Sequence, residues 1–202
     1  MNSQTRSSAS RAGVVIGIAA MVLVVVASNY LVQFPVQPEQ VPGGFADGVM
    51  GLFGIPVNEL LTWGAFTYPV AFLVNDLTNR RLGQAAARKV VLVGFVLAVL
   101  ISIWVADWRI ALASGTAFLV AQLVDTRLFS ALRDGAWWKA PVISSTLAST
   151  IDTALFFSIA FIGTGLPWAT WALGDYSVKL LVALLMLIPF RALLHVTRPA
   201  AV

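Results

Sequence analysis

Six apolar runs dominate this chain, and each is long enough to cross a bilayer as one helix, for which about 20 predominantly apolar residues are needed. Hydrophobic residues make up 59% of the 202 residues and charged residues only 11%, whereas roughly a quarter of the residues in a soluble domain are charged. We therefore expect an all-α integral membrane protein with six transmembrane helices. These expected helices cover residues 13–32, 59–79, 90–106, 110–132, 142–163 and 177–194.

The two ends of the chain are short and polar. Residues 1–12 carry Arg6 and Arg11 and are expected to form a disordered cytoplasmic tail, residues 13–196 the transmembrane domain, and residues 197–202 a second cytoplasmic tail. A cleaved signal peptide is the competing interpretation of the first run. That run, however, exceeds the usual apolar core of about 7 to 15 residues, and no small-x-small cleavage site follows it. Pro69 lies inside the second run and removes one backbone hydrogen bond there, so we expect a kinked second helix.

The distribution of basic residues predicts the orientation. With the N-terminus inside, eleven of the 13 Lys and Arg residues fall on the cytoplasmic side, and only Arg109 and Lys179 fall on the outer side. This bias follows the positive-inside rule and predicts a multi-pass protein of the bacterial inner membrane, N-in and C-in. The basic residues stand at the ends of apolar runs and not along one stripe. The sequence pI of about 10 therefore does not indicate a nucleic acid partner.

Metal, cofactor and enzyme chemistry have no support in the sequence. The absence of cysteine excludes disulfides, thiolate metal sites and a cysteine nucleophile, and the one histidine, His195, argues against a histidine metal site. No nucleophile, base and orienting residue stand at catalytic spacing, and there is no GxxxxGK[ST] nucleotide loop. We expect no cofactor and no enzyme activity. Any uphill movement of a substrate would draw on an ion gradient or on a partner ATPase.

Three carboxylates remain inside the expected helices: Asp76, Asp125 and Asp152. Burying an ionisable group at bilayer depth costs about 2.5 to 3.5 kcal/mol on insertion scales, so each needs a partner, a water-filled cavity or a function. On helical spacing, each shares a face with amides, hydroxyls or aromatic rings. The candidate binding residues are Tyr68, Phe72, Asn75, Asp76, Asn79, Phe118, Gln122, Asp125, Ser149 and Asp152.

Each carboxylate also has a purely structural interpretation. Asp76 stands four residues before Arg80, and Asp125 stands close to Arg127, so simple ion pairs would account for both. Asp152 has no basic residue within a turn of its own helix, so its pairing would require a partner from another helix. The aromatic and serine residues are equally compatible with packing between helices.

Two of the expected helices resemble each other locally. The segments AFLVNDLTNRRL (71–82) and AFLVAQLVDTRL (117–128) match at seven of twelve positions. Both run from outside to inside, which fits either a parallel duplication or a chance similarity of apolar sequences.

Together the carboxylates and amides offer planar hydrogen-bonding edges, and the aromatic rings offer flat stacking faces. A pocket of this kind suits a small planar heterocycle with donors and acceptors on its rim.

Several short motifs resemble those of one transporter family. They are Thr62, Gly64 and Phe66; Pro69 followed seven residues later by Asp76; Gly83 and Arg88-Lys89; Ala117-Phe118 leading to Gln122-Leu123 and Asp125; and Ser145-Thr146 leading to Ile151-Asp152-Thr153 and Phe156. In order and spacing, the chain resembles the queuosine precursor transporters of the vitamin uptake transporter family over residues 50–160. The resemblance implies a six-helix inner-membrane protein that takes up 7-deazaguanine precursors of the tRNA base queuosine, in their cyano or aminomethyl form.

The resemblance also implies substrate contacts for Asp76, Gln122, Asp125 and Asp152. The chain departs from the family pattern at Arg80, where many relatives have glutamate one turn after the aspartate, so a role of that glutamate does not carry over. The resemblance does not choose between the two precursors.

Other interpretations stay open at the level of sequence. Transport coupled to protons through one of the three carboxylates is one hypothesis. A substrate-binding subunit energised by a partner ATPase module is another, and a membrane scaffold or enzyme whose polar groups only hold helices together is a third. A homo-oligomer is compatible with so small a bundle, although no residue requires one.

Overall fold

The computed structural model describes residues 3–31, 34–105, 108–165 and 168–194, and this part of the chain is all helical apart from turns and loops. The expected all-α class is confirmed. The elements are α1 (Ser3–Leu31), the 3₁₀ helix η1 (Pro38–Gln40), α2 (Phe45–Phe53), α3 (Val57–Leu60), α4 (Trp63–Thr67), α5 (Val70–Leu82), α6 (Gln84–Val105), α7 (Trp108–Leu132), α8 (Lys139–Phe161), α9 (Trp168–Leu185) and α10 (Leu187–Ala192).

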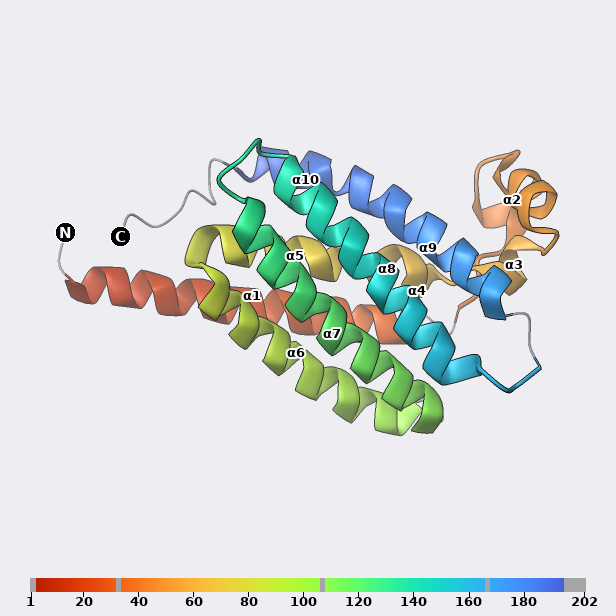
Figure 1. Ribbon diagram of the computed structural model, residues 1–202, viewed down its shortest axis with the longest axis horizontal. Coiled ribbons are helices and arrows are strands. Elements are labelled where there is room, and N and C mark those ends of the chain that lie inside the picture. Colours follow the sequence, from red (N-terminus) through yellow and green to blue (C-terminus); the bar gives the residue numbers. More distant parts are fainter. Residues whose placement is uncertain (1–2, 32–33, 106–107, 166–167, 195–202) are drawn as a thin grey trace.

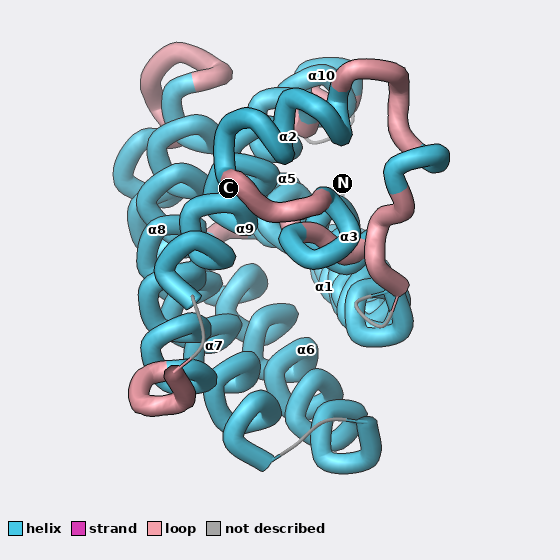
Figure 2. Tube along the Cα trace, turned by 90° about the vertical axis from the view of Figure 1, so that its right-hand side faces the viewer, coloured by secondary structure: helices cyan, strands magenta, loops and turns pink. Residues whose placement is uncertain are grey.

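The long helices lie side by side in an elongated bundle (Figure 1). The start of α1 lies near one end of the bundle, toward which α10 also points, and the short helices α2 and α3 lie at the opposite end. Figure 2 shows the bundle turned by 90°, with α6 and α7 on one side of it and α1 and α8 flanking them. Helix α7 packs most extensively on α8, and α1 packs on α5 and α6. The interior is therefore formed by residues far apart in the sequence.

Each of the six apolar runs expected to span a membrane contains helix, with α4 and α5 together in the second run and α9 and α10 in the sixth. Within the described residues, three segments are long and apolar enough to cross a membrane by length and composition alone. They are Arg11–Ser28, Lys139–Phe161 and Trp168–Ala192.

Several helix boundaries differ from those expected, most of all the starts of α1 and α9. Helix α1 begins at Ser3, inside the tail expected to be disordered, because extending a helix that already exists carries no nucleation cost. Helix α9 begins at Trp168 and not near residue 177. Gly174 lies inside this helix and allows close packing, because a Cβ at this position would lie 2.5 Å from Leu60 Cδ1. The expected tail at 197–202 and the end of the expected transmembrane domain at 195–196 lie outside the described residues.

The second run is interrupted at Tyr68 and Pro69, between α4 and α5. The amides of Ala71 and Phe72 donate to the carbonyls of Tyr68 and Pro69 at 3.0 and 3.1 Å, so the hydrogen bonds here span three residues instead of four. The interruption sets Tyr68 at the junction of two helices in the bundle interior, where its hydroxyl reaches α8.

The bundle exposes large apolar side chains and buries several polar ones within a mainly apolar interior. The large hydrophobic side chains Leu23, Trp104 and Ile188 are 70%, 89% and 70% exposed, while Asp, Asn, Gln and Lys side chains are buried. An exterior of this kind suits a surface that faces lipid. Apolar packing also holds the helices together: Met21 of α1 is fully buried, and a Cβ at Gly94 of α6 would lie 2.7 Å from its Cγ.

Candidate functional site

Buried polar side chains fill the centre of the bundle in three groups. One group is an ion network, defined as Tyr68, Asp152, Thr153, Asp175 and Lys179. The second is a set of amide and hydroxyl bonds between α5 and α7. The third, called here the unpaired cluster, contains the buried side-chain atoms that have no hydrogen-bond partner on Asp76, Gln122, Asp125, Ser144 and Ser149.

The ion network joins α8 and α9 to the break between α4 and α5. The Lys179 ammonium donates to Asp152 Oδ2 at 2.7 Å and to Thr153 Oγ1 at 3.2 Å. It also pairs with Asp175, one turn earlier on α9. The Tyr68 hydroxyl donates to Asp152 Oδ1 at 2.9 Å, and the Thr153 hydroxyl donates to Asp175 Oδ2 at 2.9 Å. Asp152 therefore has a cation and a hydroxyl as partners, and the Lys179 side chain is only 6% exposed.

Sequence reasoning missed the basic half of this network. Lys179 counted there as one of two basic residues on the outer side, and neither Asp175 nor Thr153 was a candidate. Because α9 begins at Trp168, Asp175 and Lys179 stand one turn apart inside a helix and face α8. A usable signal was present: an aspartate and a lysine four residues apart in an apolar segment, in a chain where Asp152 lacked a partner.

The candidate amides Asn75 and Asn79 are fully engaged in structure. Asn75 Nδ2 donates to Asp125 Oδ2 at 2.8 Å and lies 2.9 Å from Thr126 Oγ1. Asn79 Nδ2 donates to the Thr126 carbonyl at 2.7 Å, and the Ser130 hydroxyl donates to Asn79 Oδ1 at 2.9 Å. These bonds fasten α5 to α7, and the substrate contacts expected for the two asparagines stay a prediction.

The unpaired cluster is the part of the interior with free hydrogen-bonding capacity. Both amide atoms of Gln122 are buried without a partner, as are Oδ1 of Asp76, Oδ1 of Asp125 and the hydroxyls of Ser144 and Ser149. The Gln122 side chain has 0% exposure. Buried polar atoms are nearly always hydrogen-bonded in folded proteins. The two Gln122 amide atoms and the Ser149 hydroxyl in particular therefore indicate a place where a polar ligand or ordered water completes the bonding.

Aromatic rings border this cluster. Tyr68 lies 6.2 Å from Phe72 and 6.2 Å from Phe118, measured between ring centroids, with interplanar angles of 85° and 76°. Phe72 and Phe118 occupy the same position in the repeated segments 71–82 and 117–128, as do Asp76 and Gln122. The two similar segments thus present matching ring and polar residues around Tyr68.

The simplest structural pairings of Asp76 and Asp125 are absent. Within the described residues, the ion pairs that form involve Lys179, and neither carboxylate pairs with the arginine near it in sequence. Arg80 Nε is buried without a hydrogen-bond partner, and the Arg127 side chain is exposed. Asp125 instead accepts a hydrogen bond from Asn75, the residue next to Asp76, so the two carboxyl groups lie at the same contact between α5 and α7.

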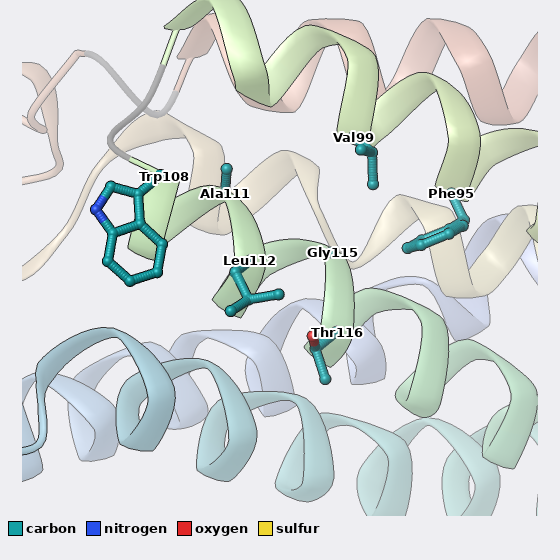
Figure 3. Close-up of a pocket in the computed structure, with 7 residues that line it drawn as sticks. All are labelled: Phe95, Val99, Trp108, Ala111, Leu112, Gly115 and Thr116. Carbon is teal, nitrogen blue, oxygen red and sulfur yellow. The ribbon is translucent and has the colours of Figure 1, made fainter.

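Two hollows bear on the location of the site. A groove between α6 and α7 is lined by Phe95, Val99, Trp108, Ala111, Leu112, Gly115 and Thr116 (Figure 3). Thr116 supplies its one side-chain hydroxyl among apolar and aromatic neighbours, so the groove offers little to a polar heterocycle. A smaller cavity, of the size of about one water molecule, is lined by Asp76, Pro69 and Ser145 and also by Met186 and Phe190. This second hollow lies between Asp76 of the unpaired cluster and Phe190 of α10.

The chain matches a known protein family described as "Putative vitamin uptake transporter". The match covers residues 62–106 and 102–194, more than half of the chain. The chain belongs to this family. Within the described residues, this chain has no group of three or more His, Cys, Asp or Glu side chains that could hold a metal ion.

Curated relatives carry more specific names. A "Probable queuosine precursor transporter" of Haemophilus influenzae is 35% identical over 83% of this chain and 80% of its own length. The "Queuosine precursor transporter" of Escherichia coli is 32% identical over 85% of this chain and 81% of its own length. A "Probable queuosine precursor transporter" of Bacillus subtilis is 26% identical over 71% of this chain. No solved structure matches this chain.

Proposed function

We propose that this protein is a transporter that imports queuosine precursors, which are 7-deazaguanine derivatives, across the bacterial inner membrane. The names of the two relatives that are 35% and 32% identical support this function. The proposal includes a six-helix, N-in and C-in arrangement in the membrane, supported by the positive-inside bias and by the apolar exterior. Transport, not catalysis, is the proposed activity.

The observation that carries the proposal is the free amide edge of Gln122 inside the bundle. Both its oxygen and its nitrogen are buried without a partner, between Phe118 one turn before it and Asp125 one turn after it. A guanine-like ring presents a carbonyl acceptor beside ring N–H and amino donors on one edge. A glutamine amide can bond to the acceptor and a donor together, and a neighbouring carboxylate can accept from the remaining donors. The residues at the site therefore match the edge of the proposed substrate.

The aromatic residues supply the other half of the recognition. A flat heterocycle buries its faces best against rings, and Tyr68, Phe72 and Phe118 surround the centre of the site. The cavity at Asp76 holds about one water molecule, so this conformation is closed around the site. In the proposed cycle, the bundle opens at one end to admit the substrate and at the other to release it.

A host that cannot make queuosine provides the direct test. The chain is expressed, the cyano or the aminomethyl precursor is fed at nanomolar concentration, and queuosine is measured in tRNA. We expect rescue by at least one precursor. The absence of rescue by both, with the protein present in the membrane, would overturn the proposal.

A matched pair of variants connects the rescue to the site. Gln122→Leu removes two hydrogen bonds to the substrate and is expected to weaken apparent affinity about 5- to 150-fold, since each bond contributes about 0.5 to 1.5 kcal/mol. Gln84→Leu, at the start of α6 and outside the site, makes the same chemical change and is expected to leave uptake unaltered. Equal effects of the two variants would remove Gln122 from recognition.

Purified protein in proteoliposomes then separates a complete transporter from a subunit that needs a partner. Accumulation of labelled precursor by the chain alone is expected. Binding without accumulation under any ion gradient would favour a substrate-binding subunit energised by an ATPase module.

A further inference from the structure

Asp76 and Asp125 are two buried carboxyl groups that form no ion pair within the described residues. They belong to α5 and α7 and are 2% and 0% exposed as residues. Asn75, next to Asp76 in α5, donates to Asp125 Oδ2 at 2.8 Å, so both carboxyl groups lie at the same contact between the two helices. Two ionised carboxylates in contact inside a bundle of low dielectric constant repel each other strongly, and each also loses its hydration. Such pairs in proteins hold a proton between them or bind a cation.

The charged groups around the pair do not supply the missing cation. Arg80 is the nearest base along α5, but it forms no ion pair with Asp76, and its Nε atom has no partner. Lys179 of α9 forms ion pairs with Asp152 of α8 and with Asp175 of α9. Arg109 of α7 donates to the carbonyls of Ile159 and Ile162 at 2.7 and 2.6 Å. The other basic side chains of α1, α5, α6, α7, α8 and α10 whose burial is described are exposed: Arg11, Arg81, Arg88, Lys89, Arg127, Lys139 and Arg191.

The two carboxyl groups differ in their surroundings. Asp125 Oδ2 accepts a hydrogen bond from Asn75 Nδ2 at 2.8 Å, which favours the ionised form of Asp125. Within the described residues, Asp76 receives no such bond from an amide or a base. Its Oδ1 atom has no partner, and its side chain borders the small cavity toward Met186 and Phe190. Asp76 is therefore the member of the pair suited to carry a proton and to exchange it with water.

The ion network provides the contrast. There the ammonium of Lys179 lies between two carboxylates, the Tyr68 hydroxyl donates to Asp152 Oδ1, and the Thr153 hydroxyl donates to Asp175 Oδ2. Asp152 has both a cation and a hydroxyl donor, so its charge is compensated in the closed state. The network holds α8 and α9 together, and the capacity to take up a proton resides in the Asp76–Asp125 pair.

We propose that the Asp76–Asp125 pair is the proton-binding site that drives uphill import, which rests on the proposed function. One proton enters with the substrate from the outer side and is held between the two carboxyl groups. It leaves from Asp76 through the small cavity toward the α10 end of the bundle, which is the cytoplasmic end in the N-in arrangement (Figure 1). Substrate and proton then reach the cytoplasm together.

Transport measurements on the purified full-length protein in proteoliposomes test the coupling. A labelled precursor is offered with an acid-outside pH gradient and with no gradient, while a trapped pH-sensitive dye records proton entry. For the wild type we expect accumulation about tenfold or more above the no-gradient level, since a gradient of one pH unit corresponds to a factor of ten. Proton entry is expected to follow precursor entry.

The variants Asp76→Asn and Asp125→Asn are expected to lose the response to the gradient, so that any residual transport only equilibrates the precursor. Asp134→Asn, in the exposed loop before α8, removes a carboxylate of similar charge outside the bundle and is expected to keep the full response. Accumulation that remains gradient-driven in both pair variants would overturn the assignment to this pair.

Infrared spectra give a readout that does not depend on transport by the variants. A protonated carboxyl group has a C=O stretching band separate from that of a carboxylate. We expect this band in the wild type and in Asp134→Asn, and its loss in Asp76→Asn. A wild-type spectrum without the band, or a band that persists in Asp76→Asn, would contradict the proposal.

The outcomes also separate this inference from the function on which it rests. A wild-type protein that moves no precursor under any condition refutes the proposed function. A wild-type protein that moves precursor with no proton entry and no response to the gradient refutes the coupling alone.

Discussion

The replacement of Lys179 by methionine is the most informative perturbation of the ion network. Methionine keeps the length of the apolar stem but removes the ammonium that contacts Asp152, Thr153 and Asp175. Asp152 would then be a buried carboxylate with only the Tyr68 hydroxyl as a partner.

The expected loss of stability follows from this geometry. Removing one partner of a buried ion pair costs about 3 to 5 kcal/mol because it leaves an uncompensated buried charge. That corresponds to more than about a 100-fold change in the unfolding equilibrium, at 1.4 kcal/mol for each factor of ten. Asp175 is 19% exposed in its side chain and contributes less to this penalty than Asp152 does, at 5%.

A double variant isolates the cause. In Lys179→Met combined with Asp152→Asn, the unpaired charge is gone, and replacing a whole buried pair by neutral groups is often close to neutral in stability. We therefore expect the double variant to recover at least about 2 kcal/mol of the single-variant loss, a coupling typical of groups in direct contact.

Denaturation by dodecyl sulfate in mixed micelles, followed by tryptophan fluorescence, measures these differences. Lys139→Met, at the exposed start of α8, is the matched control and is expected to change stability by less than about 0.5 kcal/mol. If Lys179→Met is as stable as this control, or if Asp152→Asn gives no recovery in its background, the structural role assigned to the network is refuted.

Three further variants probe the site and its packing. Tyr68→Phe removes the hydroxyl that donates to Asp152 Oδ1 at 2.9 Å, and we expect a loss of about 1.5 to 3 kcal/mol, typical of hydrogen bonds to charged groups. Gly94→Ala places a Cβ 2.7 Å from Met21 Cγ, and overpacking at this contact between α1 and α6 is expected to cost about 1 to 3 kcal/mol. Gln122→Leu removes the amide oxygen and nitrogen, which are buried without partners. This variant is expected to raise the free energy of unfolding by about 1 to 3 kcal/mol while it weakens uptake. All three are read by the same denaturation assay.

Controls for these variants come from the same chain. Tyr176→Phe affects an exposed hydroxyl bonded to Thr150 at 3.0 Å, so its cost is expected to stay well below that of Tyr68→Phe. Gly48→Ala, in α2, meets no atom within 4 Å and gains helix propensity of about 1 kcal/mol. A loss of stability in Gln122→Leu would show that structural bonds, and not a vacant substrate edge, explain the burial of this amide.

Helical spacing predicted which polar residues share a buried face but not what they bond to. Helical spacing placed Phe118, Gln122 and Asp125 on one face of α7, and all three are buried there. The same reasoning could not tell that Asn75 is bonded to Asp125 and Thr126 while Gln122 stays unbonded, because spacing along a helix contains no information about the neighbouring helix.

The amino-acid sequence by itself determined that the chain is helical, that its helices are apolar enough for a membrane, and that carboxylates and amides lie among them. These properties follow from local composition and from the spacing of apolar residues at the helical period of 3.6, both of which can be read from the sequence. Only the tertiary structure decided which buried charges are compensated. The pairing of Asp152 with Lys179, and the absence of an ion pair at Asp76 and Asp125 among the described residues, depend on the packing of α5, α7, α8 and α9, whose side chains meet across long separations in the sequence.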